Sequence, residues 1–275
     1  MHTVSRFLLL LVLSVLAGHA TGQESEAVLP ELIDTEEELS FAQNDGLEFV
    51  RRRGVDLYER HQAALVALDA GREVGLPETD PEGWIVLREA DALRVRFVAT
   101  CPEGPCSVLD VVIDAERLSA AALYPPEPLG PRGIQAWRAR NLVLATQTAT
   151  CSVPYNVVTF PPDESESGWT AYLIAQPEEE DVMAIGGHMR VFLDAEPESV
   201  LVAEDFSPAC LLGRRDASRN EFGINYPQAS MPAEIHVLQS LLHQVVFYVG
   251  TPFGVFTVNG DEIRTLDDRS IFDRP

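Results

Sequence analysis

The first pattern in the chain is a run of apolar residues at helical spacing over residues 35–70. Thr35 followed three residues later by Glu38 matches a capping box, which predicts that a helix begins there. Acids and arginines fill the positions between the apolar residues, which predicts one wet face and one packed face. Asp45 and Gly46 predict a break that divides this helical region in two. The apolar positions after the break are Leu47, Val50, Leu57, Ala64, Leu65 and Leu68.

The period changes to that of strands from residue 84 onward. Short runs rich in β-branched and apolar residues predict three strands, over residues 84–87, 93–98 and 108–113. Arg94 and Arg96 alternate with apolar neighbours, as expected where one face of a sheet meets water. These segments predict a small antiparallel meander.

A second helix and a second set of strands follow. Pro131 suits the first position of a helix, and the apolar spacing predicts that this helix runs over residues 131–148. A short helix is predicted over residues 232–243, and Asn259-Gly260 predicts a hairpin turn. Further strands are predicted over 156–160, 169–175, 182–193, 200–206, 245–249, 254–258 and 262–266. The fold class is therefore α+β: an N-terminal helical segment, a small antiparallel meander, then a mixed sheet with one or two packed helices.

The pattern also predicts how the chain is organised. Residues 1–20 are a signal peptide and residues 21–34 a flexible leader. Residues 35–124 form a subdomain of helix and meander, and residues 131–275 form an α+β subdomain. Tyr124–Pro128, an extended connector stiffened by proline, marks the boundary between them.

The signal-peptide prediction depends on the first twenty residues. A positive start is followed by an apolar run over residues 7–16 and by small residues before Ala20, which predicts cleavage after Ala20 or after Gly22. An uncleaved anchor is the alternative, but the run is shorter than the roughly 20 residues that span a bilayer. We expect a protein with no integral membrane span, exported to the periplasm or the exterior.

The net charge of the chain limits which partners are expected. The chain carries 20 basic and 43 acidic residues, a formal charge of −23, and it contains no lysine. Chemistry that requires lysine, such as a Schiff base, is therefore excluded, and nucleic acid is not an expected partner. We expect the surplus acids to neutralise the arginines, which would leave no basic patch.

Four cysteines fit an oxidising compartment. The favoured pairing is Cys101 with Cys106, across a tight loop, and Cys151 with Cys210. A zinc site is the alternative, although the spacing lacks a second close pair or a nearby histidine.

Histidines supply the candidates for chemistry. His188 follows Gly186-Gly187 inside an apolar strand, and paired glycines of this kind mark a bulge that presents His188 and Arg190 at a cleft or merely bends the strand. His236 and His243 share a predicted helix, seven residues apart, which is long for one metal ion. No zinc-protease motif, serine-nucleophile elbow or glycine-rich phosphate loop is present. The acidic segments 163–166 and 178–181 are expected to be solvated turns, with calcium binding as the alternative.

These patterns lead to a function hypothesis with one rival. The leading hypothesis is a non-enzymatic envelope protein that binds or scaffolds a protein or small-molecule partner, without a cofactor or metal. The rival is a hydrolase whose site includes His188 and Arg190.

Two resemblances complete the sequence evidence. The segments Gly54–Ala70, Cys151–Phe160, Gly186–Asp194 and Pro232–Thr251 resemble landmarks of a family of secreted bacterial proteins with no assigned activity. This resemblance implies export and a shared fold.

The C-terminal third is similar to the late part of JAB/MPN metalloprotease-like domains. The similar features are a helix introduced by Ser-x-Pro-Ala-Glu, an apolar strand ending in Gly-Thr, and a hairpin. Ile224 and Tyr226 stand where those domains carry the histidines of a His-x-His-Pro zinc motif, followed by Ser230 and Glu234. The resemblance therefore implies that the metal site is absent.

Overall fold

The computed structural model describes residues 35–75, 81–115, 117–146, 151, 153–163, 166–179, 181–207, 209–215 and 220–266, with side chains from residue 44 onward. The predicted signal peptide, residues 1–20, and leader, residues 21–34, lie outside the described residues. Contacts divide the chain into two units, Met1–Ser40 and Phe41–Pro275, and the sheets all belong to the second unit. The expected α+β fold class is confirmed.

The N-terminal element is one uninterrupted helix, α1 (Thr35–Val74), of 40 residues. The predicted break at Asp45-Gly46 is wrong. A glycine inside a helix costs about 1 kcal/mol relative to alanine, but here it lets another segment approach, because a Cβ at Gly46 would lie 2.8 Å from the Cε of Met231. The helix ends before Gly75, whose φ of +84° is the left-handed conformation that glycine adopts at a helix end.

The predicted meander is confirmed and has four strands rather than three. β1 (Gly83–Glu89), β2 (Ala92–Cys101), β3 (Gly104–Ile113) and β4 (Leu118–Pro128) pair in order, each antiparallel to the next. The segment Tyr124–Pro128, predicted to be a connector, is the end of β4. Its prolines argue against a strand in the sequence, because proline cannot donate a hydrogen bond to a neighbouring strand. They are tolerated here because β4 lies at the edge of the sheet.

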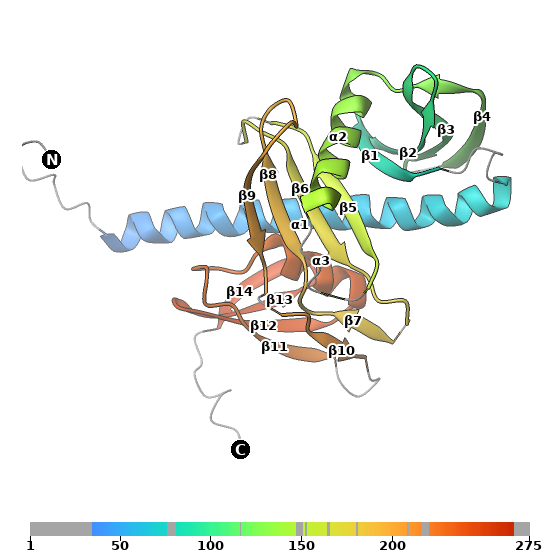
Figure 1. Ribbon diagram of the computed structural model, residues 1–275. Helices are drawn as coiled ribbons and strands as arrows, with labels where there is room; N and C mark the ends of the chain where they lie inside the picture. Colours follow the sequence, from blue (N-terminus) through green and yellow to red (C-terminus); the bar gives the residue numbers. More distant parts are fainter. Residues whose placement is uncertain are drawn as a thin grey trace, which may run out of the picture. The chain divides into compact units, whose positions relative to one another are not determined.

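A second helix and a second sheet follow. α2 (Pro131–Thr146) packs on β1, β5 and β6 (Figure 1). The sheet has the order β5-β6-β8-β9, all antiparallel. Its strands are β5 (Tyr155–Phe160), β6 (Thr170–Ala175), β8 (Met189–Leu193) and β9 (Val200–Asp205).

The prediction of one long strand over 182–193 is wrong. This segment forms two separate strands, β7 (Val182–Ala184) and β8. The backbone turns between them at Gly187, with φ +84°. A side chain at Gly186 would meet the Ala209 carbonyl at 2.5 Å. The glycine pair therefore makes a sharp corner held close to a neighbouring segment.

β10 (Leu212–Arg214) pairs with β7 in a separate sheet of two strands. The C-terminal part is the expected mixed sheet. In it, β11 (Glu221–Asn225) runs parallel to β12 (Val246–Thr251). α3 (Glu234–His243) connects these two parallel strands. β13 (Gly254–Asn259) and β14 (Glu262–Leu266) complete the sheet as antiparallel neighbours.

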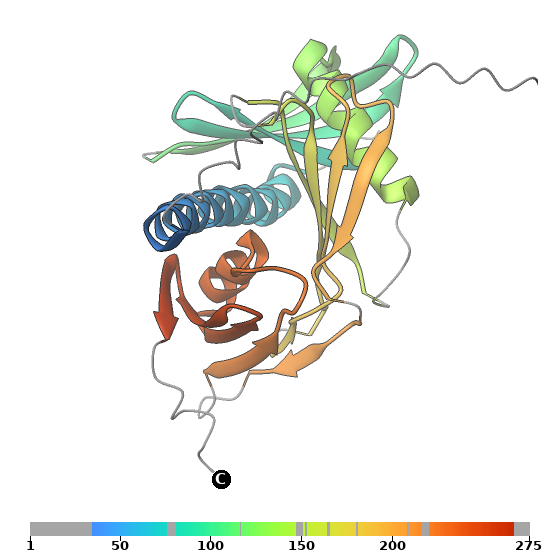
Figure 2. The ribbon, with the colours of Figure 1, turned by 90° about the vertical axis from the view of Figure 1, so that its left-hand side faces the viewer.

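From residue 41 onward, α1 packs against several parts of the second unit. Figure 2 looks nearly along α1 and shows the first sheet, the second sheet, and α3 with the C-terminal sheet around it. Val50 and Leu57 belong to a core cluster shared with α3 and the C-terminal sheet. Ala63, Ala64 and Ala67 belong to a cluster shared with the meander. A helix packed on several sides also buries some of its polar residues, and these lead to the candidate site.

Candidate functional site

His188, the first sequence candidate, is buried beneath the surface. It is 1% exposed, and both ring nitrogens are used. Its Nδ1 accepts the Ala175 N–H at 3.1 Å, and its Nε2 donates to the Ala184 carbonyl at 2.8 Å. Burial lowers the pKa of His188 to about 4, so the ring is neutral near pH 7. His188 therefore stabilises the corner between β7 and β8.

Arg190, the second candidate, is held by two carboxylates. It contacts Glu204 at 2.6 Å and also pairs with Glu234 at the start of α3. Glu234 is 1% exposed, and its Oε1 accepts a hydrogen bond from the Tyr172 hydroxyl group, with 2.6 Å between the two oxygens. The guanidinium compensates a buried carboxylate, which is costly to leave unpaired. The arrangement joins β6, β8, β9 and α3.

A well-formed cavity lies elsewhere. It measures about 410 Å³, within the usual range for small-molecule sites. Four segments form its wall: α1, the end of β1, the first turn of α2, and the end of β5 with the loop after it. The lining residues are Phe49, Arg52, Arg53, Asp56, Arg60, Arg88, Arg132, Phe160, Pro161, Pro162 and Asp163.

The wall of this cavity has the opposite charge to the chain. Among the described residues, five arginines and two aspartates line it, a formal +3, whereas the whole chain carries −23. Ion pairs engage four of these five arginines, as expected from the excess of acid, and among the described residues Arg132 is the lining arginine without one. Three other carboxylates, Glu48, Glu59 and Glu166, pair with lining arginines but do not line the cavity.

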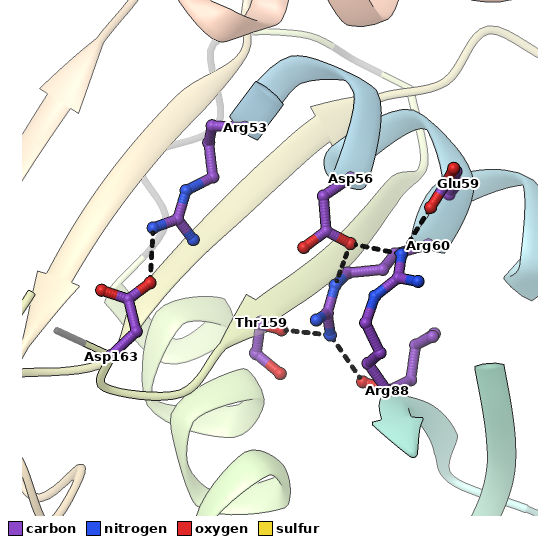
Figure 3. A network of polar contacts seen from close by, with 8 residues as sticks. Arg53, Asp56, Glu59, Arg60, Arg88, Thr159 and Asp163 are labelled. Carbon is purple, nitrogen blue, oxygen red and sulfur yellow. Dashed lines mark hydrogen bonds and ion pairs between the residues drawn. The ribbon is translucent and has the colours of Figure 1, made fainter. Parts of the chain in front are cut away.

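Asp56 holds two of the arginines (Figure 3). Its Oδ1 accepts from Arg60 Nε at 2.9 Å and from Arg88 Nη2 at 2.8 Å. Burial would raise the pKa of Asp56, but Arg60 and Arg88 outweigh burial and hold that pKa below its usual value. The carboxylate is therefore ionised near pH 7 and fixes two guanidinium groups that come from α1 and β1.

Arg60 is the most enclosed of the lining arginines, with 5% exposed. Its Nη1 donates to the carbonyls of Val86 and Thr159, each at 3.4 Å. Burial lowers the pKa of Arg60 from its usual value, and Asp56 opposes that effect. Arginine is not deprotonated in proteins. Arg60 therefore adds a fixed positive charge to the cavity wall.

Arg53 is fixed by aromatic rings and carboxylates together. Its guanidinium carbon lies 5.4 Å from the centre of the Phe49 ring and 4.5 Å from that of Phe160. It pairs with Asp163 at 3.3 Å and with Glu166 at 3.0 Å. Cation–π contacts of this kind contribute roughly 0.5–2 kcal/mol. Asp163, from a segment expected to be a solvated turn, is thus part of the cavity wall.

The remaining two lining arginines are much freer. The Arg52 side chain is 68% exposed, and its ion pair with Glu48 is long, at 3.7 Å. Arg132 is exposed in the first turn of α2, and no ion pair joins it to any residue that the structure describes. These two side chains have donors available to a ligand.

His61 and His236 are also buried and hydrogen-bonded. His236 Nδ1 accepts the Ala233 N–H at 2.9 Å, and His61 Nδ1 lies 2.8 Å from Asn156 Nδ2. Burial lowers the pKa of His61 and His243 to about 4 and that of His236 to about 3. Within the described segments, no group of three or more His, Cys, Asp or Glu side chains is placed to hold a metal ion.

The cysteines form the pairing favoured from the sequence. Cys101 is bonded to Cys106, and Cys151 to Cys210. No helix in the described part of the chain is both long and apolar enough to cross a membrane.

The sequence contained one signal for the cavity. Arg53, Asp56 and Arg60 are spaced three and four residues apart, so they share one face of a helix. Three charged residues on one helix face usually mark a face exposed to solvent. Here they line the cavity because other elements pack against α1. Comparisons of the chain with family models, with curated proteins and with solved structures find no match.

Proposed function

We propose that the chain is an exported, non-enzymatic protein that binds a small anionic molecule in the arginine-lined cavity. The observation that carries the proposal is the gathering of five arginines with two aspartates among the described lining residues, in a chain of charge −23. Guanidinium groups present planar pairs of donors that match carboxylate and phosphate oxygens.

Export is supported by the N-terminal pattern and by the disulfides. Residues 1–20 have the order of charged, apolar and small residues that is typical of a signal peptide. Cys101–Cys106 and Cys151–Cys210 disulfides persist in oxidising compartments.

Binding accounts for the cavity better than hydrolysis does. Arginines cannot accept a proton near pH 7, and both lining carboxylates, Asp56 and Asp163, are engaged by arginines. His188 and Arg190, on which the hydrolase alternative depends, are not among the cavity-lining residues. The described part of the wall therefore favours the binding of negative charge, and its two carboxylates are both paired with arginines.

The experiment is a thermal-shift screen of the purified protein with small anions, followed by titration calorimetry on those that bind. A ligand at about 100 times its Kd raises the unfolding free energy by about 2.7 kcal/mol. R132E should abolish binding without loss of stability, because Arg132 is exposed and unpaired among the described residues.

The matched control is R138E, which changes an exposed arginine of the same helix outside the cavity. R138E should bind the anion as tightly as the unmodified protein does. Anion binding to both proteins should weaken as the salt concentration rises. Failure of every anion to bind, or equal binding to R132E and R138E, would refute the proposal.

A further inference from the structure

The five lining arginines fall into two groups. Arg53, Arg60 and Arg88 are held by carboxylates at distances of 3.3 Å or less. Arg52 and Arg132 are exposed and weakly paired or unpaired within the described residues. A ligand that binds the first group competes with fixed ion pairs, whereas the second group offers free donors.

The two free arginines come from different walls of the cavity. Arg52 belongs to α1 and Arg132 to the first turn of α2, and both line the cavity. Two guanidinium groups with free donors on separate elements favour an anion with two charged groups, because each group can then be held by its own arginine.

The cavity wall also includes apolar side chains. Phe49, Phe160, Pro161 and Pro162 all contribute to the same wall. Apolar surface next to arginines favours a ligand with hydrocarbon between its charged groups, because burial of that hydrocarbon is favourable while its ends remain polar.

We infer that the ligand has two separate anionic groups joined by a short hydrocarbon spacer, with one group bound by Arg52 and the other by Arg132. This inference rests on the proposed function of the cavity. Arg53, Arg60 and Arg88, each held by carboxylates, belong to the same wall. The shared chemistry is that of a small dicarboxylate, and the 410 Å³ of space limits the ligand to a small molecule.

The test is titration calorimetry at low salt with a series of linear dicarboxylates, each compared with the monocarboxylate of equal chain length. Inorganic phosphate serves as a compact anion. We expect the best dicarboxylate to bind at least about tenfold tighter than its monocarboxylate, since a second charge-assisted contact is added. R52A and R132A should each reduce this preference severalfold, and the double variant should lose little more than either single variant.

Matched controls lie on the same two helices. Arg72 on α1 and Arg138 on α2 are exposed and outside the cavity, so R72A and R138A should retain the preference. Circular dichroism checks that all variants are folded.

The outcomes separate this inference from the proposed function. Dicarboxylate preference that depends on both Arg52 and Arg132 supports the inference. Equal affinity for monocarboxylates and dicarboxylates, or tightest binding of phosphate, overturns it and leaves the cavity an anion site if R132E still abolishes binding. No binding of any probe overturns both.

Discussion

Acid should unfold this protein through its buried histidines. His61, His188 and His236 are each 4% exposed or less, and burial lowers their pKa values to about 4, about 4 and about 3. In the unfolded chain the same side chains titrate near pH 6.5. Below that pH the unfolded state binds protons that the folded state does not, so stability falls as pH falls.

The magnitude follows from proton linkage. Each buried histidine contributes a slope of up to about 1.4 kcal/mol per pH unit between its folded and unfolded pKa values. Three such histidines give a slope of about 4 kcal/mol per pH unit over roughly pH 5 to 6. A total stability of about 5–15 kcal/mol is typical of domains, so much of it should be lost above pH 4.

The assay is urea unfolding of the disulfide-intact protein at several values between about pH 5 and about pH 6.5, where the plot of unfolding free energy against pH measures proton uptake. Carboxylates add little in this window, because ion-paired groups such as Asp56 contribute stability that is lost only closer to their unfolded pKa near 4.

The H188Q variant makes the test specific. Glutamine supplies a donor and an acceptor in place of the two bonds of His188 but does not titrate. Its slope should be smaller by nearly one proton, whatever its stability at neutral pH. A slope below one proton for the unmodified protein, or an unchanged slope for H188Q, would show that the histidines are not buried in the neutral form.

Two predictions concern packing and cross-linking. G54A should destabilise the protein by about 1–3 kcal/mol in urea unfolding, because its Cβ would lie 2.5 Å from the Cβ of Val237 on α3; a stabilised variant would contradict this close helix contact. G133A in α2 is the control, because its Cβ would meet its nearest neighbour at 3.4 Å, so it should be neutral or stabilising. Replacing Cys151 and Cys210 with alanine should cost about 4 kcal/mol, because the bond closes a 59-residue separation. The loss should exceed that from removing the other disulfide, which spans five residues; equal losses would refute the loop-entropy reasoning.

Local patterns determined many of the elements. The period of 3.6 identified α2, and the alternation around Arg94 and Arg96 identified β2. These predictions succeed because each element buries one face, which leaves a periodic trace in the sequence. Short strands leave almost no trace, so β10, of three residues, was not predicted.

The errors have tertiary causes. Asp45-Gly46 has the local chemistry of a break, yet α1 continues because Gly46 gives Met231 room to pack. The prolines of β4 favour a connector locally, but the sheet edge accepts them. In both cases a distant segment compensates a local preference.

The candidate site divides in the same way. The sequence alone determined the excess of acid, the absence of lysine, and the shared helix face of Arg53, Asp56 and Arg60. Only the tertiary structure brought Arg88 and Arg132 to that face and buried it against other elements. The physical reason is that net charge sums over the whole chain, whereas a ligand responds to the few charges within a Debye length of it, and those are set by folding.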